Sequence, residues 1–543
     1  MKSVFYRIAV AIFALLGAQP AFAEWQKAES DRFVIYSDSD AEDLADFARM
    51  LERYHVAMEL ESGRRIPVPS PSNRLTVYLV GSVEELRVLY GAPNSSIGGF
   101  YIPNANGSVA FVPNVRIRSF DGSRGETGTR RRRGTGDTLS RELDTLLHEY
   151  AHHFLIGTSR HAMPRWLSEG AAEYFSSARF NPDGSVDLGL PNNDRAWEIS
   201  QAAQVSLEEL LDYETYRKNR GSRYDAYYGR SWLLFHYLRF NPARAGQLTG
   251  YWQAVANGVD SLSAARQIFG DLDALEAELK AYGRQRSMSG MRFAADRIRI
   301  GKVSVAQLSP GHAAMMPVIM RSNRGVNKEQ AAEVVTEARR IATRFSGDSA
   351  VLSALAEAEY DAGNDDAAIA AANAAIAADP KAIDAYVQKG YALFRKAGTA
   401  EDKSAAYLAA MQPFEALNAI EADHTQPLIY YFRSFANRGV SPPDGARQAL
   451  ERASELAPFD QQLSIEVALL KVSEGEHSLA RFMLAPVAAD PHGGKRAAAA
   501  RTLIERLSTV PDGRAIDLSG VVFGSDGDTG NTDGDGEGEG DGS

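Results

Sequence analysis

The sequence predicts an α+β domain followed by an all-α array of helical repeats, and two observations predict this fold class. Residues 24–115 alternate between short runs rich in β-branched and aromatic residues and segments with helical periodicity. Residues 330–507 are instead Ala-rich and helical throughout. A chain of 543 residues can bury two or three cores. We therefore expect a first domain over residues 24–305 and a second over residues 330–507.

The first residues have the features of an export signal. A positively charged start precedes an apolar segment over residues 8–18, and residues 21–23 form a small-x-small cleavage site. We therefore expect residues 1–23 to be removed after Ala23, which implies a periplasmic or secreted protein. The apolar segment is too short to span a bilayer and no later run is long enough, so we expect no transmembrane segment. The chain has no Cys, which in an exported protein favours a bacterial periplasm.

The net charge of −11 is concentrated at the C-terminal end. Seven acidic residues and no basic residue lie in the last eighteen positions, so the body of the chain is nearly neutral. Proteins that bind nucleic acid usually carry a basic patch, and we expect no nucleic acid as a partner here. Residues 511–543 are rich in Gly, Asp and Glu and are expected to form a disordered acidic tail.

Residues 24–115 are expected to contain strands and helices in alternation. Period-two runs rich in Val, Tyr and Ile predict strands, and apolar residues at three- and four-residue steps predict helices. These patterns give strands at 32–37 and 75–80, helices at 41–60 and 83–90, and a hairpin formed by 98–102 and 108–112. His55, on the first helix, is expected to be packed rather than to bind a metal. Residues 119–137, which include four arginines at 130–133, are expected to form a solvated loop, with a mobile cover over a cleft as the alternative.

The segment at residues 139–156 predicts an amphipathic helix that carries the main functional signal. It contains His148-Glu149-Tyr150-Ala151-His152, which matches H-E-x-x-H. Residues four apart lie one above the other on a helix, so both imidazoles can reach one Zn²⁺. Glu149 is placed to act on a water at the metal. A solvated helix face with two His and one Glu is the alternative.

A second expected helix, beginning near Pro164, offers a third ligand. Glu169 follows His152 after sixteen residues and can complete a three-ligand site, which leaves the fourth position open as a catalytic zinc requires. Glu173 lies one turn later on the same face and can bond the other ring nitrogen of a ligating His. An ordinary acidic helix face is the alternative for both residues.

H-E-x-x-H followed by Trp-Leu-Ser-Glu-Gly at residues 166–170 resembles the gluzincin metallopeptidases, and most of all the peptidase MA-like domains. The resemblance implies a thermolysin-like α+β zinc peptidase domain. It implies that Glu149 is the general base. It also implies that zinc is held by His148, His152 and Glu169.

Two further expectations come from the same resemblance. In gluzincins an edge strand beside the active-site helix pairs with the substrate backbone, and residues 108–112 are our candidate, with an ordinary edge strand as an equal alternative. The substrate-binding residues would be Ser108, Val109 and Ala110. A Tyr or His from the later helical region often donates to the oxyanion, and residues 196–292 are expected to be helical. Tyr228 is the first candidate and Tyr227 the second, with a core aromatic as the alternative for either.

Residues 330–507 resemble tetratricopeptide repeats. Counting from Ser349, small and apolar residues fall on the repeat pattern up to Pro380, and Pro458 and Pro491 are thirty-three residues apart. Three or four degenerate helix pairs would stack into a curved array with a concave binding surface, which implies a protein partner.

These features predict an exported zinc-dependent metallopeptidase that hydrolyses peptide bonds in a peptide or protein. The lack of an aminopeptidase exopeptidase motif favours an endopeptidase. The alternative is a non-catalytic periplasmic scaffold that carries tetratricopeptide-like repeats and a zinc-binding pseudo-peptidase domain.

Overall fold

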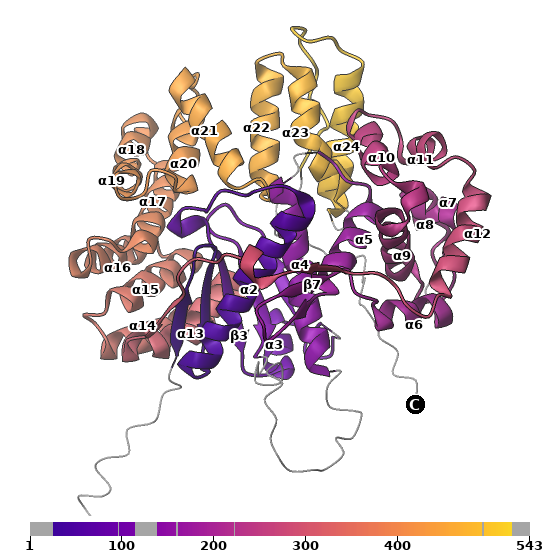
Figure 1. Ribbon diagram of the computed structural model, residues 1–543. Helices are drawn as coiled ribbons and strands as arrows, with labels where there is room; N and C mark the ends of the chain where they lie inside the picture. Colours follow the sequence, from indigo (N-terminus) through magenta and orange to yellow (C-terminus); the bar gives the residue numbers. More distant parts are fainter. Residues whose placement is uncertain are drawn as a thin grey trace, which may run out of the picture. The chain divides into compact units, whose positions relative to one another are not determined.

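The computed structural model describes residues 25–95, 97–114, 138–158, 161–221, 223–490 and 493–523, with the backbone alone at 138–142 and 158. The predicted signal peptide, the arginines at 130–133 and the acidic end of the chain lie outside these residues. The chain divides into two compact units (Figure 1). The site unit comprises Ser30–Val34, Asp46–Val303 and Glu421–Ser543, and the repeat unit comprises Met1–Glu29, Ile35–Ala45 and Ser304–Ile420.

The site unit contains a group of three neighbouring strands, and two of them form the predicted hairpin. β3 (Leu75–Val80) pairs in parallel with β5 (Val109–Pro113), and β5 pairs antiparallel with β4 (Phe100–Ile102). α3 (Val83–Tyr90) follows β3 along the chain, with Ser82 as its N-cap. The predicted strand at 75–80, the helix at 83–90 and the hairpin are thus confirmed. β2 (Phe33–Ser37) and α2 (Ala41–Ser62) are shared between the units.

The expectation that residues 108–112 form an edge strand is wrong. In β5, Val109 lies opposite Thr76 on one side and Ile102 on the other, so both backbone edges are already paired. Ser108, Val109 and Ala110 are also buried. A substrate strand cannot add to an edge that is occupied, so these three residues cannot pair with a substrate backbone. A period-two pattern identifies a strand but does not identify its neighbours.

α4 (Thr138–Thr158) and α5 (Arg165–Ser176) pack against each other, and α4 also contacts β4 and β5. The face of α4 that the apolar periodicity predicted is buried, including Leu146, Leu147 and Phe154. His55 packs against this helix as expected, because its Nδ1 lies 2.6 Å from the hydroxyl of Tyr150.

The part of the chain that follows α5 is mostly helical and packs against α5. Its central helix is α9 (Tyr227–Phe240), which is buried around most of its circumference and packs on α5, α6, α7, α10 and α12. A Cβ at Gly170 would lie 2.4 Å from the backbone oxygen of Ser231, so only glycine permits the close approach of α5 to α9. The other helices are α6 (Asn193–Gln201), α7 (Leu207–Leu211), α8 (Tyr213–Asn219), α10 (Gln247–Ala256), α11 (Ser261–Phe269) and α12 (Leu272–Gly283). A small antiparallel sheet joins β6 (Arg179–Phe180), β7 (Val186–Leu188) and β8 (Met291–Phe293).

The site unit also includes the last five helices of the described chain, which pack in sequence order (Figure 1). They are α20 (Thr425–Ala436), α21 (Asp444–Leu456), α22 (Gln461–Ser473), α23 (His477–Ala489) and α24 (Gly494–Ser508). The carboxylate of Asp460 accepts the backbone N–H of Ala105 at 2.8 Å, and Glu421 accepts the hydroxyl of Ser72 at 2.8 Å. One boundary between the compact units, at Val303 and Ser304, lies close to the predicted domain end at 305, but Glu421–Ser543 group with the site unit and not with the repeat unit.

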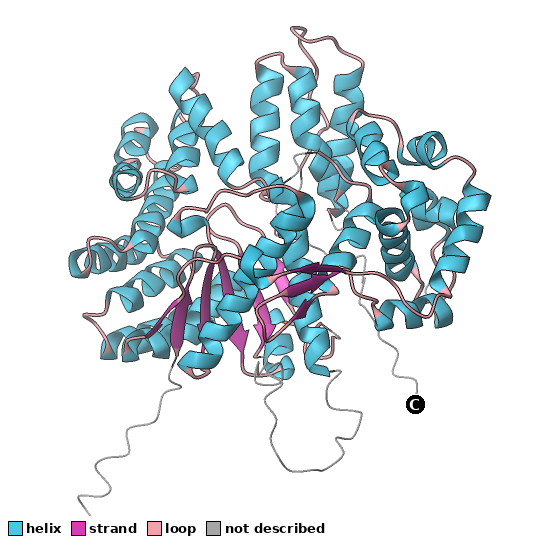
Figure 2. Ribbon diagram, viewed as in Figure 1, coloured by secondary structure: helices cyan, strands magenta, loops and turns pink. Residues whose placement is uncertain are grey.

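The repeat unit consists of helices that pack against their neighbours in the sequence, together with an antiparallel pair of β1 (Gln26–Glu29) and β9 (Ser304–Gln307). Its helices are α13 (Pro310–Arg324), α14 (Lys328–Arg344), α15 (Ser349–Asp361), α16 (Asp365–Ala378), α17 (Ile383–Ala397), α18 (Lys403–Ala410) and α19 (Gln412–Ile420). Figure 2 shows that the described residues after β9 form helices and loops, with no strand among them. The predicted all-α region is confirmed there, and it begins with α13, before residue 330.

The expectation of disorder does not hold for residues 511–523. Ile516, Val521 and Phe523 pack on the apolar cluster of α22, α23 and α24, and the carboxylate of Asp512 accepts the backbone N–H of Ser478 at 2.9 Å. Residues 511–523 are therefore ordered, because they contain apolar side chains that the acidic repeat lacks.

Among the described residues, no helix combines the length and the apolar character that a bilayer crossing requires.

Candidate metal centre

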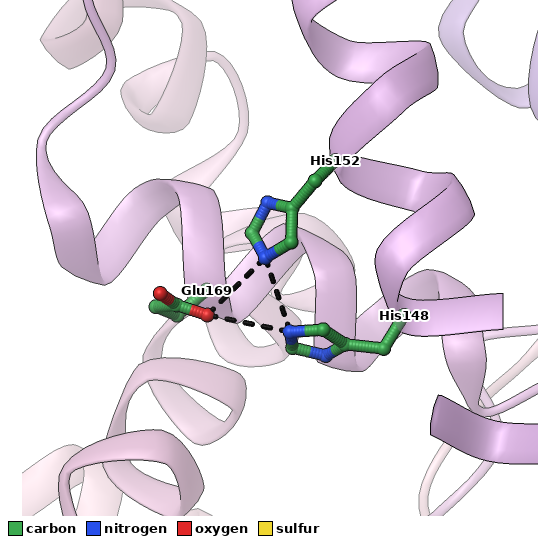
Figure 3. Close-up of side chains that lie close together, drawn as sticks. All are labelled: His148, His152 and Glu169. Atoms are coloured by element: carbon green, nitrogen blue, oxygen red, sulfur yellow. Dashed lines mark hydrogen bonds and ion pairs between the residues drawn. The ribbon is translucent and has the colours of Figure 1, made fainter. Parts of the chain in front are cut away.

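Three predicted ligands meet between α4 and α5 (Figure 3). The Nε2 atoms of His148 and His152 are 3.0 Å apart. Oε2 of Glu169 lies 3.4 Å from the first and 3.3 Å from the second. The turn of α4 places the two His side by side, and α5 presents Glu169 to both.

The geometry of these side chains fits a tetrahedral cation. Zinc bonds of about 2.0–2.1 Å place the ligand atoms of a tetrahedron about 3.3 Å apart, which is close to all three separations. Glu169 is 1% exposed, and neither of its oxygens accepts a well-formed hydrogen bond from the described chain. A buried carboxylate without donors is costly, and a cation at the point where the three atoms converge would remove that cost. The donor set of two imidazoles and one carboxylate suits zinc.

The carboxylates and imidazoles of the cluster shift one another's pKa values. Burial lowers the pKa of His148, but the carboxylates of Glu169 and Glu173 outweigh burial and raise that pKa well above its usual range. Burial raises the pKa of Glu169, but the two histidines outweigh it and hold that pKa well below the usual range. The carboxylates thus stay ionised and attract positive charge to the site.

Both histidines are oriented by a partner on α5. Oε1 of Glu173 lies 3.1 Å from Nδ1 of His148, which is the contact predicted between these two side chains. The hydroxyl of Ser168 lies 3.2 Å from Nδ1 of His152. Burial raises the pKa of Glu173, but Arg195 and His148 together outweigh burial and lower the pKa to about 2. Glu173 is therefore an anion that fixes the His148 ring.

Sequence reasoning missed the arginine that pairs with Glu173. Arg195 on α6 donates to Glu173 at 2.7 Å and to Glu198 at 2.6 Å, and Glu198 in turn accepts the backbone N–H of Gly229 on α9. Asn192, the N-cap of α6, also donates to Glu173 at 3.3 Å. No motif marks these residues, although Asn192 is of a residue type that is common at helix N-caps.

The two candidate tyrosines have different surroundings. The ring of Tyr228 lies 6.4 Å from the ring of His148, whereas Tyr227 is 1% exposed and packs 4.4 Å from the ring of Tyr216. The hydroxyl of Tyr227 has no hydrogen-bond partner among the described residues. Tyr228 is thus beside the triad and Tyr227 belongs to the core.

Glu149 is half-buried on α4, next to His148 in the chain and outside the triad. Tyr101 lies on the outer strand β4. Burial raises the pKa of its phenol, and the negative charges of Glu149 and Asp460 raise it further. The hydroxyl of Tyr101 lies 2.7 Å from Nδ1 of His153. Ser108 is not brought to the triad, and its hydroxyl accepts from Tyr101 at 3.2 Å.

A protein-family profile described as "Protein of unknown function (DUF1570)" matches residues 142–256, which contain the triad, Glu149 and Tyr228. The search of curated proteins found no match. A thermophilic tetratricopeptide protein from Thermus thermophilus is similar in structure, with 16% identity over 36% of this chain and 95% of that chain and a TM-score of 0.28. A double mutant of MamA (RS-1 ArsTM) is similar with 14% identity over 37% of this chain and 96% of that chain and a TM-score of 0.25.

Proposed function

We propose that this protein is a zinc-dependent metallopeptidase. The observation that carries the proposal is the convergence of His148, His152 and Glu169 at tetrahedral separations, with Glu149 adjacent on the same helix. A structural zinc site usually has four protein ligands, whereas three ligands leave a position for substrate or water. The resemblance of the motifs to gluzincins supports the same conclusion.

Zinc, when bound, supplies a Lewis acid that polarises a carbonyl and makes water more acidic. Glu149 takes a proton from the attacking water, whose oxygen forms a bond with the scissile carbonyl carbon. The same carboxylic acid then gives that proton to the leaving nitrogen as the carbon–nitrogen bond breaks. Tyr228 donates a hydrogen bond to the oxyanion during the reaction.

The substrate class that this chemistry implies is a peptide or an unfolded protein, and we favour internal cleavage over aminopeptidase activity. The export signal expected over residues 1–23 favours a periplasmic or secreted location.

A second candidate function is a protein-binding scaffold without catalysis. The observation that favours it is the run of helix pairs from α13 to α19, because such pairs stack into extended binding surfaces. In that case the zinc site would stabilise the fold alone. Nothing in a structural site requires Glu149, which is why we place the peptidase first.

The experiment that separates these functions compares wild type with Glu149→Gln on an unfolded protein. Gln keeps the size of the side chain and removes its basic oxygen, so zinc content and melting temperature should stay near wild type. Hydrolysis should fall by about 10²–10⁴, the usual contribution of a general base. Glu169→Gln should instead lose zinc and activity together. Zinc-loaded wild type that cleaves no unfolded protein would favour the scaffold.

A further inference from the structure

Arg165 lies in the first turn of α5, one turn before the third ligand. The residue is 6% exposed, and its Nε lies 3.8 Å from Oε1 of Glu169. The other oxygen of that carboxylate, Oε2, is the one that faces the two histidines. The arginine therefore sits against the side of the ligand that points away from the triad.

Tyrosines from two helices fix this guanidinium. It donates through one terminal nitrogen to the hydroxyl of Tyr213 at 2.5 Å and through the other to the hydroxyl of Tyr228 at 3.4 Å. It also lies 4.9 Å from the ring centroid of Tyr213 and 5.3 Å from that of Tyr227. Aromatic faces and phenol oxygens both stabilise a cation, so these contacts hold Arg165 in one orientation.

The contact with Tyr228 affects what that phenol can do. A hydroxyl that accepts from a guanidinium points its own hydrogen away from that guanidinium. Arg195 lies 5.2 Å from the ring centroid of Tyr228, so a second cation acts on the same side chain. Positive charge at the phenol strengthens it as a donor, which suits the stabilisation of an oxyanion.

We propose that Arg165 is a positioning residue that fixes two parts of the site at once: the orientation of the ligand Glu169 and the orientation of the donor Tyr228. The second half rests on the proposed peptidase function, whereas the first half requires only that the triad binds zinc. Without the guanidinium, the carboxylate loses its ion pair and the phenol loses the donor that directs its hydrogen outward.

The first measurement is zinc affinity, determined by competition with a chromophoric chelator. Arg165→Met keeps much of the length and removes the charge. Loss of an orienting partner typically weakens metal binding by about 10- to 100-fold, and we expect a loss of at least about tenfold here. Arg230→Met is the matched control, because Arg230 is 4% exposed on the neighbouring helix α9 and pairs with Glu276 instead. The control should stay within about twofold of wild type.

The second measurement is kcat for an unfolded-protein substrate, in a cycle of Arg165→Met, Tyr228→Phe and the double variant. We expect each single variant to lower kcat by about 10- to 100-fold with little change in KM, since the contact acts in the transition state. At saturating zinc, where the weaker metal affinity of Arg165→Met no longer lowers the rate, the double variant should be within about twofold of Tyr228→Phe alone, because the arginine then acts through the phenol.

Equal zinc affinity in Arg165→Met and wild type would overturn the proposal, and so would an equal loss in Arg230→Met. Effects on kcat that multiply in the double variant would overturn the part that concerns Tyr228. If zinc-loaded wild type hydrolyses nothing, the proposed function fails, while the affinity measurement still decides whether Arg165 positions Glu169.

Discussion

The two halves of the C-terminal helical region have different surroundings. Helices α13–α19 belong to the repeat unit and pack on one another, whereas α20–α24 belong to the unit that contains the His148, His152 and Glu169 triad. Phe459, just before α22, lies 4.8 Å from His153 on α4, and Asp460 caps α22 while it accepts from Ala105. The comparison teaches that helical periodicity predicts a helix but not the surface on which it packs.

The largest effect should come from ending the chain before Glu421. The truncated protein lacks the partners of Ala105, Ser72 and His153, so the hairpin and α4 would expose apolar surface. We expect the zinc content to fall far below one per chain and the thermal transition of the site unit to be lost. A truncated chain that keeps its zinc and its melting temperature would contradict the claim that α20–α24 support the site.

Single aromatic residues give a second, smaller contrast between the halves. Phe414 is fully buried in the repeat unit, so Phe414→Ala should destabilise that unit by about 3–5 kcal/mol and leave zinc affinity unchanged. Phe459→Ala removes a half-buried ring beside His153, so it should cost less stability and weaken zinc binding by about three- to tenfold. Hydrogen exchange and chelator competition measure the two properties, and a zinc defect in Phe414→Ala would contradict the contrast.

The smallest expected contrast is in the response to pH. In α15, burial raises the pKa of Asp361 to about 6, so its contribution to stability is present below the unfolded pKa near 3.8 and is lost as pH rises through 6. In α5, the pKa of Glu173 is lowered to about 2 because Arg195 and His148 together outweigh burial, so its contribution is present above about 4.5 and is lost as pH falls.

Hydrogen exchange of the metal-free protein should therefore show α15 gaining protection from pH 7 to 4.5, with a share from Asp361 of at most about 3 kcal/mol. Protection of α5 should fall below pH 4.5. Asp361→Asn should reduce the pH response of α15, and Glu357 on the same helix, whose pKa is raised well above its usual range by burial, should supply the remainder. An unchanged response in Asp361→Asn would contradict the assignment to Asp361.

Sequence reasoning located the elements and the three side chains that converge because both depend on local spacing. The four-residue step from His148 to His152 and the step from Glu169 to Glu173 place side chains on one helix face wherever the helix lies. Other features depend on contacts between distant segments. They are the position of β5 between two strands, the packing of α20–α24 on the α/β part, the bonds from Arg165 to Tyr213 and Tyr228, and the bond from Arg195 to Glu173. Periodicity carries no information on such contacts, so these features could not be predicted.

The measurement that tests the central claim most directly is the zinc content of the purified protein, by elemental analysis without chelator. The account predicts one zinc per chain in wild type and nearly none in His148→Ala or His152→Ala, because each variant removes one of three ligands. Glu52→Gln is the control, since Glu52 is a buried carboxylate that pairs with Arg32 outside the triad, and it should keep its zinc. Wild type without zinc, or full zinc content in both His variants, would contradict the account.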